Sequence, residues 1–324
     1  MNQVLISERE DLQLMVQVAR LYYENDQTQE EIARQLNLTR QKISRLLIEA
    51  RAQGIVKIAI LDPSPGDPQL REDLKNTFHL NDVVLAASDG LEGDQLRTSI
   101  GMTAAEYLKK VLQDGKTVGV GWGRTLFEAI KTLRRNGPKR IHVIPLIGGI
   151  GDLSPFFQVN ELARRLSEAF NGTYRYFYAP AFIQDSSILE SLTKTQEIAQ
   201  LMEQWDKLDV ALVGIGQVEF QQISSMFFAD HIPPKTLAQL ESKGTVGDIC
   251  ARFFDSQGKE ILPETGVIGI GLDQLRAIPE VIGIAGGMDK VRAVLGALRG
   301  GYIKTLITDV ATARAVLAEN EKRR

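Results

Sequence analysis

From residue 69 onward, short runs of apolar residues alternate with longer segments in which apolar residues recur at helical spacing. The short runs predict buried strands, and the longer segments predict amphipathic helices. The strands are expected at residues 82–87, 117–121, 141–147, 174–178, 209–215, 266–270, 281–285 and 305–309. The helices are expected at residues 94–113, 125–136, 159–170, 195–206, 235–242, 288–299 and 310–320. Because this alternation is typical of a parallel sheet covered on both faces, residues 69–324 are predicted to form one doubly wound, Rossmann-like α/β domain.

Residues 28–52 have the pattern of two short helices joined by a tight turn. Thr28 and Glu31 have the spacing of a capping box, and Thr39 can cap the second helix. Asn37 falls in the turn, where the backbone must be left-handed and Asn tolerates that conformation. The apolar residues that face inward or fill the turn are Ile32, Ala33, Leu36, Leu38, Ile43, Leu46, Leu47 and Ala50. The pattern predicts a helix-turn-helix, whose second helix enters the major groove of DNA.

The segments on either side complete a small N-terminal domain. An amphipathic helix is predicted at residues 8–25, and its apolar residues on or near one face are Leu12, Met15, Val16, Ala19 and Tyr23. Residues 55–61 alternate as in a strand and would form a short wing, which makes the domain winged-helix-like. Residues 62–68, DPSPGDP, predict a turn-rich linker. The expected organisation is therefore a DNA-binding domain at 1–61, a linker at 62–68 and a larger domain at 69–324.

The polar face of the second predicted helix carries side chains suited to DNA. Arg and Gln can form bidentate contacts with guanine and adenine edges, and Ser can bond to a base or a phosphate. The candidate DNA-binding residues are Thr39, Arg40, Gln41, Lys42, Ser44 and Arg45. Residues 34–57 contain six Lys or Arg against one Glu, so positive charge is concentrated where phosphates would be met. The alternative is an ordinary helical hairpin whose basic face is solvated.

Composition narrows the class of protein. The 324 residues are many for one domain, and the 44% hydrophobic content is enough for a large core. The net charge of −3 says little, because the basic patch is local. The single cysteine, Cys250, excludes an internal disulfide and is expected to be packed. The N-terminus shows no apolar signal region, and no run approaches the ~20 residues of a membrane span. A cytoplasmic protein without membrane association is expected.

Several predicted strands end in glycine-rich turns. The clearest is GVGWGRT at residues 119–125, between a strand and a helix. Closely spaced glycines let the backbone approach an anion, and the following helix N-terminus supplies N–H groups. Thr125 adds a hydroxyl and Arg124 adds a charge. The spacing matches neither a P-loop nor a dinucleotide fingerprint. The alternative is that the glycines serve tight packing between strand and helix.

Further glycine turns lie at 148–149, 214–216, 247 and 286–287, and Asp248 and Lys290 are the charged residues nearest to them. In a doubly wound sheet, ligands bind beyond the carboxyl ends of the strands, where such turns meet. Asp248 could accept hydrogen bonds from sugar hydroxyls, and Lys290 could hold a phosphate or a hydroxyl. For each residue taken alone, a surface cap or an exposed helix charge is the favoured explanation.

Read together, the two halves resemble the SorC family of bacterial sugar-responsive transcription regulators over nearly the whole chain. The segments that carry the resemblance are ARLYYENDQTQEEIARQLNLTRQKISRLL, VGVGWGRT, LIGGIG, GDICARFFDSQGKEI, IGIAGGMDKVRAVLGALRGG and TLITDVATARAV. The resemblance implies a helix-turn-helix joined to an effector domain akin to sugar-phosphate isomerases and deaminases. It also implies dimers or tetramers, of which a tetramer is expected, on pseudo-palindromic operators, with a phosphorylated sugar as effector.

The resemblance also assigns site residues. It implies that Gly121, Trp122, Gly123, Arg124 and Thr125 form the loop that holds the effector phosphate. Asp248 and Lys290 match positions that contact the sugar.

One position departs from some members of the family. They carry Lys or Arg directly before the Gly-Gly after the third strand, whereas this chain has Ile147. An apolar side chain can neither form a Schiff base nor hold a second phosphate, so the identity of the effector does not transfer from those members.

Three functions compete at this point. The first is a transcription regulator of carbohydrate metabolism whose operator affinity is controlled by a phosphorylated sugar. The second is a sugar-phosphate isomerase or deaminase with an appended helical module, which would need a clustered acid–base pair. The carboxylates Asp152, Asp185, Glu190 and Asp248 are scattered, and so are His79, His142 and His231. No enzyme, metal site or cofactor is therefore expected. The third is a constitutive DNA-binding structural protein, for which the glycine turns would have no use.

Overall fold

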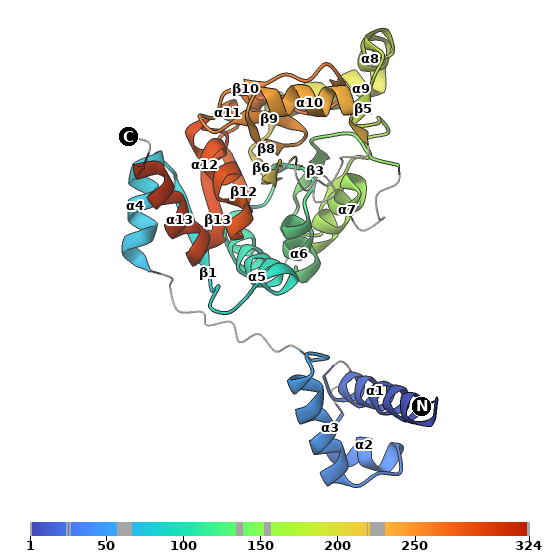
Figure 1. Ribbon diagram of the computed structural model, residues 1–324. Helices are drawn as coiled ribbons and strands as arrows, with labels where there is room; N and C mark the ends of the chain where they lie inside the picture. The colour runs from blue at the N-terminus through green and yellow to red at the C-terminus, as the bar shows by residue number, and fades with distance from the viewer. Residues whose placement is uncertain are drawn as a thin grey trace. The chain divides into compact units, whose positions relative to one another are not determined.

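The computed structural model describes residues 2–23, 25, 27–56, 67–133, 139–151, 157–218, 220 and 231–322 (Figure 1). The chain divides into two compact units, residues 1–61 and 62–324. The division falls where the sequence predicts the DNA-binding domain to end. Of the predicted wing and linker, residues 57–66 lie outside the described part of the chain.

The N-terminal unit consists of three helices, α1 (Asn2–Tyr23), α2 (Gln29–Gln35) and α3 (Arg40–Ala52). The predicted capping box is present, since Glu31 N–H donates to Thr28 Oγ1 and Thr28 N–H donates to the Glu31 carboxylate. Asn37 has a φ of 52°, so the left-handed turn is also confirmed. The core of this unit is made of Met15, Val18, Ile32, Ala33, Ile43, Leu46, Leu47 and Ala50. The side chains that α2 and α3 bury are therefore those that the helical spacing predicts.

The inner face of α1 differs from the prediction. Met15 and Val18 are buried, whereas Leu12 and Tyr23 are 44% and 37% exposed. Of the predicted residues, Ala19 is also buried, so the buried face includes Met15 and Ala19 but not Leu12 or Tyr23. An apolar groove lined by α1 residues remains on the surface of the unit.

A parallel sheet forms the centre of the larger unit. Within the described residues it has seven strands in the order β1-β13-β12-β6-β2-β3-β4, all mutually parallel. The strands are β1 (Asp82–Ala86), β2 (Thr117–Val120), β3 (His142–Pro145), β4 (Thr173–Tyr174), β6 (Val210–Gly214), β12 (Glu280–Ile284) and β13 (Thr305–Asp309). Their apolar residues are almost all buried, as expected for strands covered on both faces. The predicted doubly wound domain is therefore confirmed.

Two layers of helices cover this sheet (Figure 1). One layer contains α5 (Gly93–Val111), α6 (Arg124–Thr132) and α7 (Val159–Ala169). The other contains α4 (Pro68–Phe78), α12 (Val291–Arg299) and α13 (Val310–Glu321). Asp67 caps α4 and Pro68 occupies its first turn, so the last residues of the predicted linker already belong to the second unit.

Short antiparallel elements gather at one end of the sheet. A four-stranded sheet has the order β10-β9-β8-β7, and β11 pairs with β5. These strands are β5 (Phe182–Ile183), β7 (Gly216–Gln217), β8 (Thr245–Ile249), β9 (Arg252–Asp255), β10 (Glu260–Ile261) and β11 (Gly266–Val267). The helices at this end are α8 (Ser186–Thr193), α9 (Gln196–Met202), η2 (Glu203–Lys207), α10 (Pro234–Ser242) and α11 (Leu272–Ala277). The single turn η5 (Met288–Lys290) precedes α12.

Several sequence predictions were wrong here. The predicted strand 174–178 is paired only as β4, and 266–270 belongs to the antiparallel pair rather than the parallel sheet. The antiparallel strands at 245–255 and the helices α4, α8 and α11 were not predicted. The strands and α11 are short, and α8 has no buried residue, so none of them has a clear periodic pattern. α4 does bury Leu70 and Leu74 at helical spacing, but its cap and its first residue fall within the predicted linker.

Candidate functional site

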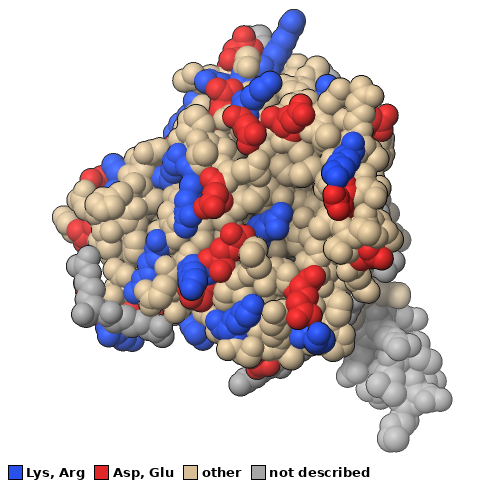
Figure 2. All heavy atoms as spheres, turned by 90° about the horizontal axis from the view of Figure 1, so that it is seen from above, with Lys and Arg blue, Asp and Glu red and all other residues tan. Residues whose placement is uncertain are grey.

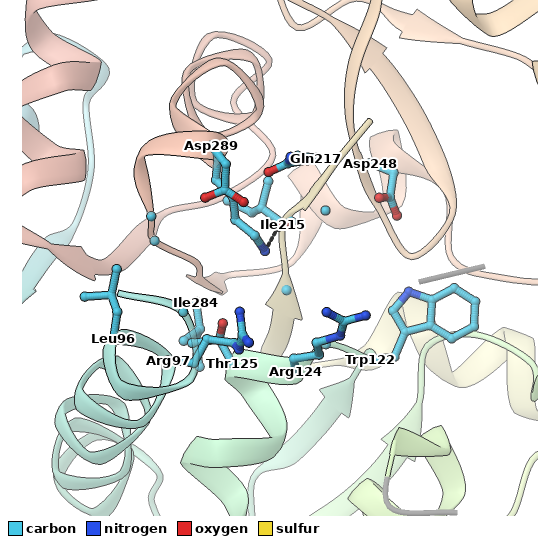
Figure 3. A pocket seen from close by; sticks show the side chains of 17 residues that line it. Leu96, Arg97, Trp122, Arg124, Thr125, Ile215, Gln217, Asp248, Ile284 and Asp289 are labelled. Atoms are coloured by element: carbon cyan, nitrogen blue, oxygen red, sulfur yellow. Dashed lines mark hydrogen bonds between the residues drawn. The ribbon is translucent and has the colours of Figure 1, made fainter. Parts of the chain in front are cut away.

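A cavity of about 310 Å³ opens beyond the carboxyl ends of β2, β6 and β12 (Figure 3). From β2 the chain winds outward through β3 and β4, whereas from β6 it winds the other way through β12 and β13. The cavity therefore lies at the point where the winding reverses, which is the usual ligand position in doubly wound sheets. It is lined by Gly93, Leu96, Arg97, Trp122, Gly123, Arg124, Thr125, Gly214, Ile215, Gly216, Gln217, Asp248, Ile284, Gly286, Gly287, Asp289 and Lys290.

The three glycines of the turn after β2 have different roles. A Cβ at Gly119 would lie 2.5 Å from Leu146 Cδ2, and one at Gly121 would lie 2.8 Å from Cys250 Sγ. These two glycines therefore serve close packing. Gly123 has a φ of 148°, which L-residues rarely adopt, and it leads directly into α6. The packing explanation thus holds for the first two positions, while Gly123 shapes the entry to the helix.

The N-terminus of α6 opens into the cavity. Phe127 N–H donates to Gly123 O at 2.8 Å, which is the first hydrogen bond of the helix. No side chain among the described residues caps this end. The backbone N–H groups of the first turn have no partner within the helix, and the helix dipole adds partial positive charge there. Thr125 is buried and Arg124 is exposed. This end of the cavity is suited to an anion.

The two sides of the cavity carry different side chains. Figure 3 shows Arg97, Thr125 and Arg124 along one side and Asp289, Gln217 and Asp248 on the other. Arg97 comes from the second turn of α5, where it also pairs with Asp94. A ligand with an anionic group at one end and hydroxyls at the other would match this arrangement.

Asp248 is a buried carboxyl group on β8, only 3% exposed. Its Oδ2 accepts from Ala251 N–H at 3.1 Å. Opposite it on β7, a Cβ at Gly216 would lie 2.0 Å from Asp248 Oδ1, so only glycine leaves room for the carboxyl group. Burial raises the pKa of Asp248 to about 7, although the Ala251 N–H and the Lys290 charge act in the opposite direction. The group can therefore exchange a proton near neutral pH.

Lys290, in η5, points its amine back to the end of β6, where Nζ donates to Ile215 O at 2.8 Å. Burial lowers the pKa of Lys290, opposed by the carboxylates of Asp289 and Asp248. Burial thus disfavours the charged forms of both Asp248 and Lys290. A ligand that supplied hydrogen bonds to both groups would replace the water they have lost.

The hairpin of β8 and β9, which carries Asp248, has a strained turn. Cys250 and Ala251 occupy its two central positions with φ values of 51° and 57°, a conformation that usually needs Asn or Gly. The turn aims the Ala251 N–H at Asp248 and packs Cys250 on Gly121. Cys250 is buried, and burial raises the pKa of its thiol, so it acts as a packing residue.

The structure brings most of the sequence-predicted effector residues together. Trp122, Gly123, Arg124, Thr125, Asp248 and Lys290 all line the cavity, and Gly121 lies beneath it. Trp122 stacks on Phe182 with ring centroids 6.3 Å apart.

Sequence reasoning missed Arg97, Gln217 and Asp289 as lining residues. Gln217 directly follows the glycine turn at 214–216, and Asp289 precedes Lys290, so proximity was an available signal. No sequence signal pointed to Arg97, because it follows β1, which lies four places from β2 in the sheet.

The other candidate residues do not form a second site. Asp185 caps α8, Glu190 pairs with Lys194, and Asp152 lies outside the described residues. Ile147 is fully buried and pairs with Gly269 rather than lining the cavity. Over the part of the chain that the structure describes, no group of His, Cys, Asp and Glu could hold a metal ion.

The second candidate site is the exposed face of α3. Thr39 caps the helix by accepting from Lys42 N–H at 3.2 Å. Arg40, Gln41 and Arg45 are exposed. The remaining predicted residues are Lys42, which is also exposed, and Ser44, which is half-buried. Glu30 lies 3.8 Å from Arg40 in an exposed ion pair. The helix thus presents exposed basic and amide side chains near its N-terminus.

The basic character of α3 is local. On the face drawn in Figure 2, Lys and Arg side chains are interspersed with Asp and Glu side chains. The whole chain has a net charge of −3. A concentration of positive charge on one helix of an acidic protein is the electrostatic pattern of a nucleic-acid contact. No helix in the described ranges is both long enough and apolar enough to cross a membrane.

Two family descriptions match the two units. Residues 63–318 match the family described as "Putative sugar-binding domain". Residues 15–53 match region 4 of sigma-70, and this stretch contains α2 and α3.

Several known proteins are similar to this chain over nearly its full length. The chain is 34% identical over 316 residues to the sorbitol operon regulator of Klebsiella pneumoniae, covering 95% of this chain and 98% of that protein. It is 32% identical over 312 residues to the deoxyribonucleoside regulator of Bacillus subtilis (strain 168), covering 96% and 99%. The crystal structure of the full-length Klebsiella pneumoniae regulator SorC superposes with a TM-score of 0.73 at 33% identity, covering 95% of this chain and 99% of that one.

Proposed function

The chain belongs to the SorC family of sugar-binding transcriptional regulators, and we propose that a phosphorylated sugar bound in the cavity controls its affinity for operator DNA. The observation that carries the proposal is the N-terminus of α6, which opens into a cavity whose other side holds Asp248 and Lys290. Both relatives are named as regulators, so the chain is a regulator and not an enzyme.

DNA binding is assigned to α3. In a helix-turn-helix the first residues of the second helix reach base edges while its cap lies near the phosphates. Arg40, Gln41 and Arg45 would read bases, and Thr39, Lys42 and Ser44 would contact phosphates. The exposure of Arg40, Gln41 and Arg45 and the match to a sigma-70 DNA-binding region support this assignment.

The effector phosphate is assigned to the loop Gly121–Thr125. A phosphate there would accept from the backbone N–H groups at the start of α6 and from the Thr125 hydroxyl, with the charge of Arg124 close by. Gly123 permits this approach because it has no side chain between the ligand and the helix end.

The sugar hydroxyls are assigned to Asp248 and Lys290 across the cavity. An ionised Asp248 accepts from a hydroxyl, and the Lys290 amine donates to one. The buried Ile147 offers neither an amine nor a charge to the ligand. At this position the chain therefore provides neither a Schiff-base amine nor a contact for a second phosphate.

Operator binding requires more than one copy, because one helix-turn-helix reads few base pairs. We expect a homo-oligomer, in particular a tetramer, on a pseudo-palindromic operator. The exposed Leu12 and the apolar groove of α1 offer one contact surface for a second copy. A monomer in light scattering with and without DNA would contradict this expectation.

The test is thermal unfolding with a panel of sugar phosphates and the matching unphosphorylated sugars. A true effector at a hundredfold excess over its Kd should stabilise the protein by about 3 kcal/mol, and its unphosphorylated form should not. Arg124→Glu places a carboxylate at the phosphate position and should abolish the shift. Lys131→Glu makes the same charge change at the far end of α6 and is the matched control. Equal stabilisation of both variants would reject the site.

A further inference from the structure

The glycine turn after β12 is fixed from behind by the start of α13. Gly287 N–H donates to Asp309 Oδ2 at 3.0 Å and to Thr312 Oγ1 at 2.8 Å. Thr312 Oγ1 in turn donates to Asp309 Oδ2 at 2.6 Å, and Asp309 Oδ1 accepts from Thr312 N–H at 2.9 Å. Asp309 and Thr312 are 1% and 0% exposed. One buried hydrogen-bonded cluster therefore joins the wall of the cavity to the first turn of a helix.

The turn is closely packed against the same cluster. A Cβ at Gly286 would lie 2.4 Å from Asp309 Oδ2 and 2.5 Å from Ile100 Cδ1. Gly287 has a φ of 110° and leads directly into η5, which carries Lys290. Gly287, which lines the cavity, is thus linked by hydrogen bonds to Asp309 and Thr312 and through η5 to Lys290.

The same helix reaches the start of the larger unit. α13 packs against α4, and the two lie side by side in Figure 1. Arg314, half a turn after Thr312, pairs with Asp67 at 3.3 Å. Asp67 also caps α4, since its Oδ1 accepts from Leu70 N–H at 3.2 Å. In chain order α4 is the first described element after the DNA-binding unit.

We propose that α13 transmits the occupancy of the cavity from the Gly286–Gly287 turn to the N-terminus of α4, where the chain leads to the DNA-binding unit. The inference rests on the proposed effector site and adds the route of its regulation. A ligand shifts such an equilibrium only if it favours one arrangement of the turn over another. The buried cluster at the N-terminus of α13 and the Arg314–Asp67 pair, two residues further along the same helix, provide the two connections.

The test is hydrogen–deuterium exchange on the full-length protein, with inorganic phosphate as the probe. In the wild type, phosphate should slow exchange at residues 121–127. It should also change the exchange rate at residues 67–74 by about fivefold or more, the lower end of ordinary allosteric coupling. Arg314→Ala removes an exposed side chain and should keep the first change but lose most of the second. Lys322→Ala, at the end of the same helix, is the matched control and should behave as the wild type.

Asp309→Asn tests the connection between α13 and the Gly286–Gly287 turn. Asn retains one acceptor for the helix cap, but its amide group cannot also accept from Gly287 N–H, so one of the two contacts is lost. This variant should bind phosphate more weakly and lose the response at 67–74 even when saturated.

A full response at 67–74 in both Arg314→Ala and Asp309→Asn would overturn the proposed route, as would protection of 121–127 in the wild type with no change at 67–74. Failure of phosphate to protect 121–127 would instead reject the effector site and the route with it.

Discussion

At the scale of single residues, burial of the Asp248 carboxyl group lowers the free energy of unfolding at neutral pH. Its pKa is raised to about 7 in the folded protein and returns to about 4 on unfolding. Between pH 4 and pH 7, Asp248 therefore holds a proton in the folded state that it has released in the unfolded state. Stability therefore falls as the pH rises through this window, and the loss is complete above pH 7. A shift of about three pKa units corresponds to at most about 4 kcal/mol.

Asp248→Asn should remove this cost, since the amide has nearly the same shape and cannot ionise. Relative to the wild type, the variant should gain stability between pH 5 and pH 8, by up to about 4 kcal/mol. Chemical denaturation at several pH values measures the difference. Asp185→Asn is the control with opposite sign, because hydrogen bonds from Ser187 lower the pKa of Asp185. A stability difference for Asp248→Asn that is independent of pH would show that Asp248 is already ionised at pH 5.

The residues that could be predicted from sequence are those whose role is local. Thr28, Asn37 and Thr39 act within three residues of their partners, so spacing alone identifies them. The lining of the cavity by Arg97 depends on the position of β1 in the sheet, which no local pattern encodes. Trp122 and Asp248 were found because each lies beside a glycine turn.

At the scale of elements, α3 is the helix on which specificity depends. Alanine at Arg40, Gln41 and Arg45 together should weaken operator binding and relax the sequence preference, at about 1–3 kcal/mol for each base reader. Binding to a selected operator and to its single-base variants measures both effects. Arg51→Ala, at the other end of α3, should reduce affinity evenly across sequences without changing the preference. Wild-type preference in the folded triple variant would mean that another element reads the bases.

The elements that sequence identified correctly are continuous apolar runs or long segments with a helical period. β13 and β6 are buried apolar runs between helices, and each was predicted to within a residue. β7 and β11 have two residues each and contain no pattern of their own. The hairpin of β8 and β9 was hidden because Cys250 and Ala251 occupy a turn that normally carries Asn or Gly.

At the scale of the whole molecule, the alternation of strands and helices predicts the sheet but not the order of its strands. That order places the turns after β2, β6 and β12 around one cavity. Sequence analysis identified three of the glycine turns but had no means of showing that they meet. It also could not show that α13 joins the turn after β12 to α4, since Asp67 and Arg314 are 247 residues apart.

The central claim is that a phosphorylated sugar in the cavity controls operator affinity. The most direct measurement is the affinity for an operator selected from random DNA, with and without the sugar phosphate that stabilises the protein most. In the wild type and in Lys131→Glu, a saturating ligand should change operator affinity by about 5- to 150-fold. In Arg124→Glu the same ligand concentration should produce no change relative to that variant without ligand. An unchanged response of Arg124→Glu at the same ligand concentration would contradict the account.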